Sequence, residues 1–231
     1  MAGPVPQRVL ETAAGTGVLT RHLVAQLPST ARIVATDLNE PMLAVAAAKV
    51  DDARVDWRQA DALALPLPDN TFDAVACQFG AMFFPDKFAG YREVFRVLVP
   101  GGRFHVNVWD RIEANDFANV VTGAMAELFP ANPPTFMARI PHGYYGVALI
   151  ESHLRDAGFG SVSVESVDAV SRAESARDAA IAYCQGSPLR NHLDPARLAD
   201  ATDATTAAIA ARFGEGPVEG RTRAHVFTAE R

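Results

Sequence analysis

The sequence contains little cysteine and no long apolar run. Among its 231 residues there are two cysteines, Cys77 and Cys184, and their separation matches no metal-ligand spacing. No apolar run approaches the roughly 20 residues that cross a bilayer. The N-terminus lacks the basic and apolar regions of a secretory signal. We therefore expect a cytoplasmic protein without membrane insertion, a metal ion or a disulfide.

Positive charge is also scarce. Lys and Arg together number 21 against 27 Asp and Glu, which gives a net charge of −6, and Lys49 and Lys87 are the only lysines. A nucleic acid would be repelled on average, and no basic stripe offsets this repulsion. The charge therefore favours a small-molecule substrate over a nucleic acid, and it leaves a homodimer open.

Short apolar runs alternate with helical patterns in the first half of the chain. The runs are rich in Val, Ile and Phe and end at polar or glycine residues, which predicts strands. Between them lie amphipathic or capped segments that predict helices. Such alternation is typical of a parallel sheet covered on both faces. The predicted strands are 8–12, 32–37, 55–59, 72–77 and 102–108, and the predicted helices are 17–27, 42–50 and 87–98.

The pattern changes after residue 110. Helical patterns predominate there, and a loop rich in proline and aromatic residues covers 129–146. Two more segments, 161–170 and 222–228, have the composition of strands. The predicted helices are 115–128, 147–157, 175–184 and 195–213. We expect one domain over residues 1–231.

A glycine turn follows the first predicted strand. Glu11 stands near the end of that strand, and Gly15 and Gly17 follow it. A dinucleotide-binding turn needs a third glycine where Thr20 stands, and no Gly-Lys pair follows as in a P-loop. Both phosphate-binding motifs therefore fail. A carboxylate at Glu11 would repel phosphate and attract a cationic group, which suits S-adenosylmethionine, because this cofactor has a sulfonium and no phosphate.

Further acidic residues follow the next two strands. Asp37 ends the second strand, 22 residues after Gly15 (37 − 15 = 22), where a carboxylate can accept both ribose hydroxyls. Asp61 and Ala62 follow the third strand and can face the adenine edge. Open α/β sheets bind ligands at the carboxyl ends of their strands. The sequence therefore predicts one cofactor site at this edge.

Together these motifs resemble class I S-adenosylmethionine-dependent methyltransferases of the ubiquinone/menaquinone methyltransferase type. The resemblance covers about residues 8–110. It depends on five motifs in the family's order: Glu11-x-Ala13-x-Gly15-x-Gly17, Asp37, Asp61-Ala62 with Ala64-Leu65-Pro66-Leu67-Pro68, Phe72-Asp73, and Leu98-Val99-Pro100-Gly101-Gly102.

The resemblance implies an α/β fold. It is a Rossmann-like, doubly wound, seven-stranded and mostly parallel sheet, with an antiparallel edge hairpin formed by 161–170 and 222–228. Residues 8–110 would be the cofactor-binding half. Residues 111–146 and 171–214 would be helical insertions that cover the substrate.

The resemblance also implies the cofactor residues. They are Glu11, Ala13, Gly15, Gly17, Asp37, Leu38, Asp61, Ala62, Gln78 and Phe79. Ala13 departs from the family, which usually has glycine there. A Cβ costs about 1–2 kcal/mol if φ is positive at that position, and little if φ is negative.

No catalytic dyad stands out. Methyl transfer is a direct displacement, so positioning in a dry pocket can supply much of the rate, and a base matters only if the acceptor loses a proton. The candidates near a substrate are His142, Tyr144 and His192, whereas His105 is expected in the core. Aromatic and methionine residues follow the strand ends, and we expect more than half of them to pack in the core or a lid and the rest to line an apolar pocket beside the sulfonium. They are Phe79, Met82, Phe83, Phe84, Trp109, Phe129, Phe136, Met137, Tyr144 and Tyr145.

The expected function is methyl transfer from S-adenosylmethionine to a small, largely apolar or aromatic acceptor. Two alternatives stay open: a non-catalytic S-adenosylmethionine-binding module, and an NAD-type oxidoreductase. The first strand comes early, and residues 1–7 contain two prolines and cannot form a covering helix. We therefore expect this chain to leave the methionine end of the cofactor without a cover. Either the chain is a shortened form of a longer protein, which we favour, or a partner subunit supplies the cover.

Overall fold

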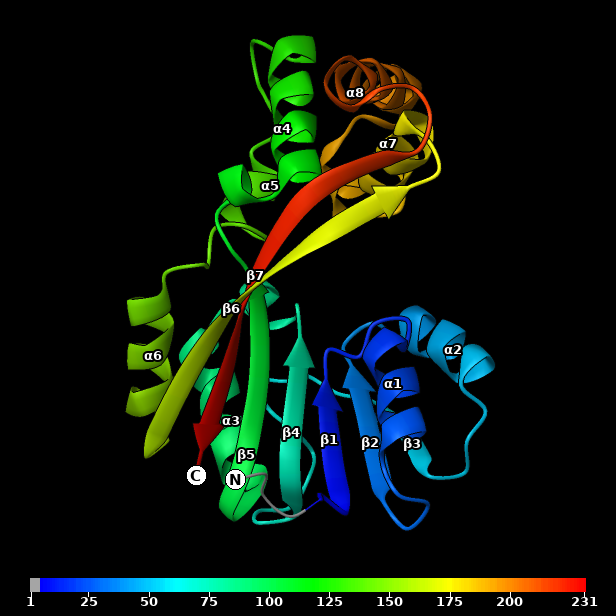
Figure 1. Ribbon diagram of the computed structural model, residues 1–231. Helices are drawn as coiled ribbons and strands as arrows, with labels where there is room; N and C mark the ends of the chain where they lie inside the picture. The colour runs from blue at the N-terminus through cyan, green and yellow to red at the C-terminus, as the bar shows by residue number, and fades with distance from the viewer. Residues whose placement is uncertain (1–4) are drawn as a thin grey trace. The chain divides into compact units, whose positions relative to one another are not determined.

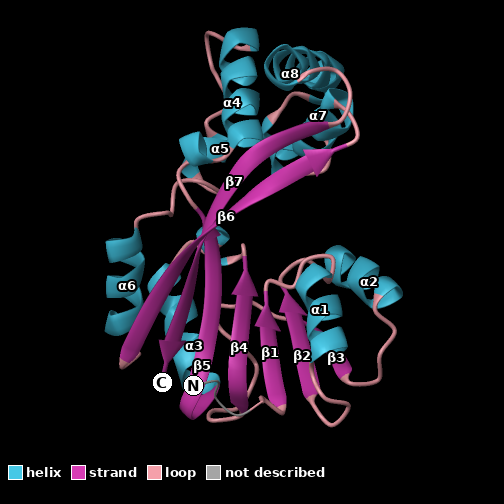
Figure 2. Ribbon diagram, in the orientation of Figure 1, coloured by secondary structure: helices cyan, strands magenta, loops and turns pink. Residues whose placement is uncertain are grey.

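Seven strands form one mixed sheet in the computed structural model, which describes residues 5–231. The strand order is β3-β2-β1-β4-β5-β7-β6 (Figures 1 and 2). Residues 5–7 form no helix, and the rest of the N-terminal segment discussed above, residues 1–4, lies outside the described residues. The strands are β1 (Arg8–Thr12), β2 (Arg32–Asp37), β3 (Val55–Gln59), β4 (Phe72–Gln78), β5 (Leu98–Trp109), β6 (Ser161–Ala173) and β7 (Val218–Glu230).

The pairing confirms the predicted fold class. Strands β1 to β5 pair in parallel, and β1 lies between β2 and β4. Strand β7 runs antiparallel to β5. Two backbone hydrogen bonds establish this direction, from Gly101 N to Arg231 O (2.9 Å) and from Asp110 N to Arg223 O (3.0 Å). Strands β6 and β7 complete the sheet at the same edge.

Eight α-helices and four short 3₁₀ turns occupy the described residues. Asn39 and Asp86 cap the helices α2 and α3, because each side chain accepts a hydrogen bond from a backbone amide three residues later. The helices are α1 (Val18–Gln26), α2 (Glu40–Lys49), α3 (Lys87–Val97), α4 (Asp116–Leu128), α5 (Phe136–Arg139), α6 (Val147–Asp156), α7 (Ala176–Cys184) and α8 (Leu198–Phe213). The 3₁₀ turns are η1 (Ala81–Phe83), η2 (Ile112–Ala114), η3 (Pro188–His192) and η4 (Pro195–Arg197).

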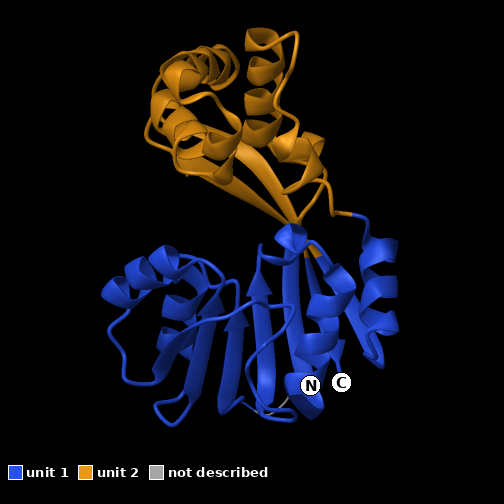
Figure 3. Cartoon of the chain, turned by 180° about the vertical axis from the view of Figure 1, so that it is seen from behind, with its two compact units in different colours: residues 1–108, 146–165, 226–231 blue, residues 109–145, 166–225 orange. Residues whose placement is uncertain are grey.

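The chain divides into two compact units (Figure 3). Unit 1 consists of residues 1–108, 146–165 and 226–231, and unit 2 consists of 109–145 and 166–225. In unit 1, Leu43 of α2 packs on Ala14 and Ala35 on one face of the sheet. On the other face, the rings of Tyr91 in α3 and Phe104 in β5 lie 5.7 Å apart. The parallel strands of unit 1 are therefore covered on both faces.

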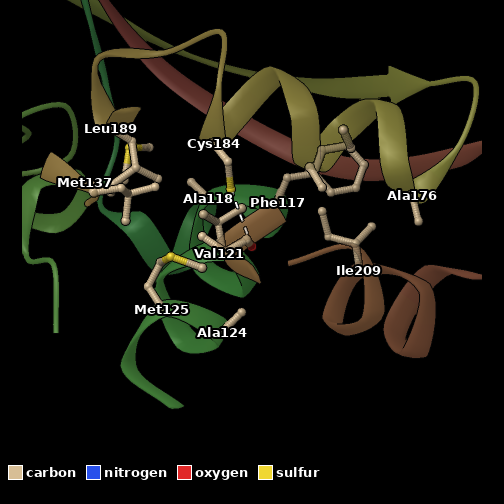
Figure 4. Packing of buried hydrophobic residues seen from close by; sticks show 14 of the residues in the cluster. Phe117, Ala118, Val121, Ala124, Met125, Met137, Ala176, Cys184, Leu189 and Ile209 are labelled. Atoms are coloured by element: carbon tan, nitrogen blue, oxygen red, sulfur yellow. Dashed lines mark hydrogen bonds between the residues drawn. The ribbon is translucent and has the colours of Figure 1, made fainter. Parts of the chain in front are cut away.

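Unit 2 has its own apolar core (Figure 4). Helices α4, α7 and α8 meet there, and the buried Val121, Ala180 and Ile209 are fully shielded from solvent. The Cys184 thiol is buried in the same cluster, and burial raises its pKa. The predicted helical patterns of 115–128, 175–184 and 195–213 thus pack against one another. No helix within the described residues is long and apolar enough to cross a membrane.

Several predicted boundaries differ from the structure. Strand β5 begins at Leu98, since the Pro100–Gly102 turn forms a register shift inside the strand, with Gly101 at φ +78°. Strands β6 and β7 are longer than predicted at 13 residues each. His105 was expected in the core but is exposed, because it alternates with the buried Phe104 along β5.

Candidate functional site

The turn after β1 has an unusual backbone. Ala13, Gly15 and Gly17 all have positive φ, at +54°, +57° and +79°. Two of the three are glycines, which adopt this conformation without a steric cost. The sequence left open whether φ is positive at residue 13. It is positive, so the Cβ of Ala13 costs about 1–2 kcal/mol.

Asp37 joins this turn to the end of β2. Its Oδ2 accepts a hydrogen bond from Gly15 N at 2.8 Å, and its Oδ1 accepts one from Asn39 N at 2.8 Å. An ionised carboxylate has about four lone-pair positions, so each oxygen keeps capacity for one further donor. The half-buried Asp37 is therefore held rigidly and can still accept two hydroxyl groups.

Glu11 lies beneath the same turn. Its carboxyl group is 1% exposed and accepts a hydrogen bond from the Thr20 hydroxyl at 2.6 Å. Burial raises the pKa of Glu11 to about 7, and the nearby Asp37 charge adds to this rise, while the bond from Thr20 opposes it. The partner of this buried carboxyl group is thus a neutral hydroxyl donor.

Thr20 therefore has a positive role. It stands where a dinucleotide turn has its third glycine, and it is completely buried at the start of α1. Its hydroxyl binds Glu11, so the side chain fills the space that a glycine would leave. In the sequence Thr20 was notable only as a departure from the dinucleotide motif. In the structure it is the hydrogen-bond donor to the buried Glu11.

The turn after β4 meets the turn after β1. Phe79 has φ +52°, and its backbone N–H lies 3.2 Å from the Asn107 carbonyl oxygen and 3.1 Å from the Asn107 Oδ1. At Gly80 a Cβ would overlap the Cβ of Ala13 and would lie 3.0 Å from the Cys77 Sγ. The two turns thus touch through a glycine, and neither Gly80 nor Asn107 was predicted from the sequence.

The other predicted cofactor residues are placed less tightly. Leu38 is 67% exposed, and its carbonyl oxygen accepts a bond from Gln59 Nε2 at 3.0 Å. Asp61 is exposed and accepts a bond from Leu63 N at 2.9 Å, which is a local turn contact. Ala62 and Gln78 are half-buried. All of them belong to unit 1 and follow or end strands, as the sequence predicted.

The base candidates lie in unit 2. His142 is 5% exposed, and its Nδ1 lies 2.9 Å from the Asp110 carbonyl oxygen, to which it must donate. Burial lowers the pKa of His142, which favours the neutral imidazole at pH 7. Tyr144 is buried as well. His192 stacks on Phe136, with the ring centres 4.3 Å apart.

His192 also lines a cavity of about 470 Å³ in unit 2. Phe129, Pro134 and Arg197 line it as well, and the Arg197 guanidinium lies 5.1 Å over the Phe129 ring. The volume lies within the range of small-molecule sites. Of the aromatic and methionine residues noted in the sequence, Met82, Phe84, Met137 and Tyr144 are buried, so much of that set is core packing.

Comparisons with known proteins cover the part of the chain that contains these turns. Residues 9–102 match the family described as "Methyltransferase domain". Over this part, which is less than half of its length, the chain is similar to class I S-adenosylmethionine-dependent methyltransferases.

Curated relatives match the same part of the chain. A demethylmenaquinone methyltransferase of Thermus thermophilus is 45% identical over 103 residues, which are 44% of this chain and 46% of the relative. A ubiquinone/menaquinone biosynthesis C-methyltransferase of Enterobacter sp. strain 638 is 41% identical over 104 residues, or 43% of this chain and 41% of the relative. The alignments thus span less than half the length of these relatives.

Solved structures match nearly the whole chain in fold. The YcgJ protein of Bacillus subtilis has a TM-score of 0.62 at 17% identity, covering 98% of this chain and 92% of that one. A phosphoethanolamine N-methyltransferase of Haemonchus contortus, solved with S-adenosyl-L-methionine, scores 0.62 at 17% identity, covering 100% and 50%. The [4+2]-cyclase SpnF scores 0.61 at 22% identity, covering 97% and 74%. At these identities the likeness concerns the fold alone.

Proposed function

We propose that this protein binds S-adenosylmethionine and transfers its methyl group to a small, largely apolar or aromatic acceptor. The contact that carries the proposal is the bond from Gly15 N to Asp37 Oδ2 at 2.8 Å. It fixes a carboxylate with free lone pairs beside a turn whose backbone runs through positive φ at three residues. A carboxylate beside such a turn suits a ribose next to a methionine chain. The turn carries neither of the two phosphate-binding motifs.

The residues present fit the cofactor in three respects. Asp37 can accept the two ribose hydroxyls while it holds the turn. Gly80 lets the turn after β4 pack directly against Ala13, since a Cβ there would overlap the Ala13 Cβ. Glu11 places a titratable carboxyl beneath the turn, and this group would favour a cationic ligand once ionised. When bound, the cofactor supplies an electrophilic methyl group.

The chain's own contribution to the reaction is positioning. Asn107 holds the backbone N–H of Phe79 and so fixes the end of β4, which is the edge proposed to border the methyl group. Holding two reactants in line can supply several kcal/mol of the barrier, on the order of 7–11 in the best cases. A base is needed only for an acceptor that loses a proton, and the neutral His142 and the cavity-lining His192 remain its candidates.

The acceptor is proposed from charge and from the relatives. The acidic chain, at −6, disfavours nucleic acid. The curated relatives that match residues 9–102 are named for demethylmenaquinone and for ubiquinone and menaquinone biosynthesis. We therefore propose a quinone or phenol ring as the class of acceptor to be tried first.

A methylation assay tests this proposal. The chain is incubated with methyl-labelled S-adenosylmethionine and separate pools of quinols, phenols, RNA, DNA and protein. Labelling of a small aromatic acceptor is expected. Robust labelling of RNA or DNA would contradict the proposal. Cofactor binding without transfer to any pool would instead favour the non-catalytic alternative, and the cyclase in the same fold shows that fold alone does not decide this.

A further inference from the structure

A chain of three polar side chains lies in unit 2, and it meets the base candidate His142 at the carbonyl oxygen of Asp110. Ser166 of β6 has its Oγ 2.9 Å from the Nδ1 of His225 in β7. The Nε2 of His225 lies 3.2 Å from Oδ1 of Asp110, which follows β5. The pairing of antiparallel strands places these groups together, since Asp110 N donates to Arg223 O at 3.0 Å.

The carboxylate decides where the imidazole proton sits. Asp110 can only accept when ionised, so the nitrogen facing it, Nε2, must carry the hydrogen. In its neutral form the ring then presents the lone pair of Nδ1, and the Ser166 hydroxyl donates to it. This is the arrangement in which a hydroxyl proton can pass to an imidazole held by a carboxylate.

The imidazole and the carboxylate are shielded from solvent, whereas the serine is exposed, and this difference suits transfer of the hydroxyl proton to the imidazole. His225 is 6% exposed and the Asp110 side chain is 13% exposed, so the imidazole and its carboxylate are shielded. Asp110 Oδ1 also accepts a bond from Arg111 N at 2.6 Å, which fixes its orientation. Ser166, by contrast, is exposed and open to a substrate.

A cation and a cavity lie on the same two strands as the hydroxyl. The Nε of Arg223 lies 3.5 Å from Asp110 and 3.8 Å from Asp168, and it makes no hydrogen bond within residues 5–231. Arg223 precedes His225 by two residues and so shares its strand face, where its charge can stabilise an oxyanion. A cavity of about 420 Å³ on the same two strands is lined by Asp168, Val170 and Arg221, among others.

We propose that Ser166 is an activated nucleophile that accepts a short acyl group from an activated ester. Its Oγ forms a bond to the carbonyl carbon while its proton passes to Nδ1 of His225. The bond from that carbon to the leaving oxygen then breaks, and the alcohol leaves with the proton from His225. Water then attacks the acyl carbon while its proton passes to Nδ1 of His225. The bond from that carbon to the Ser166 Oγ breaks, the Oγ takes the proton from His225, and the carboxylic acid is released. This activity is separate from the proposed methyl transfer.

The experiment uses the full chain without S-adenosylmethionine. The protein is treated with p-nitrophenyl acetate and, separately, with a fluorophosphonate probe, and the adducts are located by peptide mass mapping. A single adduct on Ser166 is expected, and Ser166→Ala should remove it. Because a general base contributes roughly 10²–10⁴-fold, His225→Gln should slow labelling at least about tenfold, and Asp110→Asn should slow it too.

Ser163→Ala is the matched control, since Ser163 lies on the same strand and its hydroxyl bonds to Thr228 O. This variant should label as the parent does. Circular dichroism establishes that each variant is folded, and only folded variants are compared. The proposal is overturned if Ser166 of the folded parent is not labelled, or if it is labelled no faster than Ser163. Equal labelling rates in the parent and the folded His225→Gln variant would overturn it as well.

Discussion

At the scale of single residues, Glu11 is the group whose charge depends most directly on the fold. Its pKa rises from 4.5 to about 7, chiefly through burial, so the folded protein keeps a proton that the unfolded chain loses between these values. The contribution of Glu11 to the free energy of unfolding is therefore fully present below pH 4.5 and is lost as pH rises through 7. Glu11→Gln keeps an acceptor for Thr20 and removes this loss.

The stability difference between Glu11→Gln and the parent should therefore shift in favour of the variant from pH 4.5 to pH 8. Linkage sets an upper limit of about 3 kcal/mol on this shift. Urea unfolding of both proteins without ligand at the two pH values measures it. The exposed Glu165→Gln serves as the control and should follow the parent at both. A Glu11→Gln difference that is equal at both pH values would show that Glu11 does not titrate in this way.

Ala13 stores strain that a glycine would relieve. Its φ of +54° costs about 1–2 kcal/mol, and a glycine loses about 0.5–1 kcal/mol in chain entropy on folding. Ala13→Gly should therefore stabilise the protein by roughly 0.5–1 kcal/mol. Chemical denaturation checks this, with the exposed Ala64→Gly as a control that should give no gain. A loss of stability in Ala13→Gly as large as in the control would contradict the strain.

At the scale of elements, the turns after β1 and β4 should be coupled through Gly80. Gly80→Ala would place a Cβ against that of Ala13, and overpacking of this kind typically costs about 1–3 kcal/mol. Adding Ala13→Gly removes one partner of the overlap, although the Cys77 Sγ remains 3.0 Å away. The double variant should therefore recover part of the lost stability.

A double-mutant cycle by urea unfolding measures this coupling. Gly123→Ala is the control, since a Cβ there meets nothing within 4 Å in helix α4. It should not destabilise, and it should add independently to Ala13→Gly. If the effects of Gly80→Ala and Ala13→Gly are simply additive, the two turns are not in contact as described.

Some strand bounds and contacts could be predicted from the sequence and others could not. The bounds of β1, β2 and β3 were predicted as observed. The buried strands β1 and β2 are apolar and end at polar residues, and the edge strand β3 alternates apolar and polar residues. The start of β5 was missed, since its register shift depends on pairing with β4 and β7. The Glu11–Thr20 bond and the Gly80 contact were missed as well, because each joins segments whose approach no local pattern records.

At the scale of the whole molecule, the central claim is that unit 1 holds an adenosine through Asp37 in the absence of any phosphate motif. Unit 1 contains all the predicted cofactor residues, from Glu11 to Phe79. The fold by itself is shared with a cyclase, so ligand binding decides more than similarity does. The bond from Gly15 N to Asp37 makes the claim specific to one carboxylate.

Calorimetry with S-adenosylhomocysteine and NAD⁺ tests this claim most directly. We predict that the first ligand binds and the second does not. Asp37→Ala should weaken binding by about tenfold to a few hundredfold. Two hydrogen bonds to a charged group, at about 1.5–3 kcal/mol each, set the upper limit, and water replaces part of that loss. Asp56→Ala, an exposed carboxylate paired with Arg58 on β3, is the matched control and should bind as the parent does. Unchanged affinity in Asp37→Ala, or tighter binding of NAD⁺ than of S-adenosylhomocysteine, would contradict the assignment.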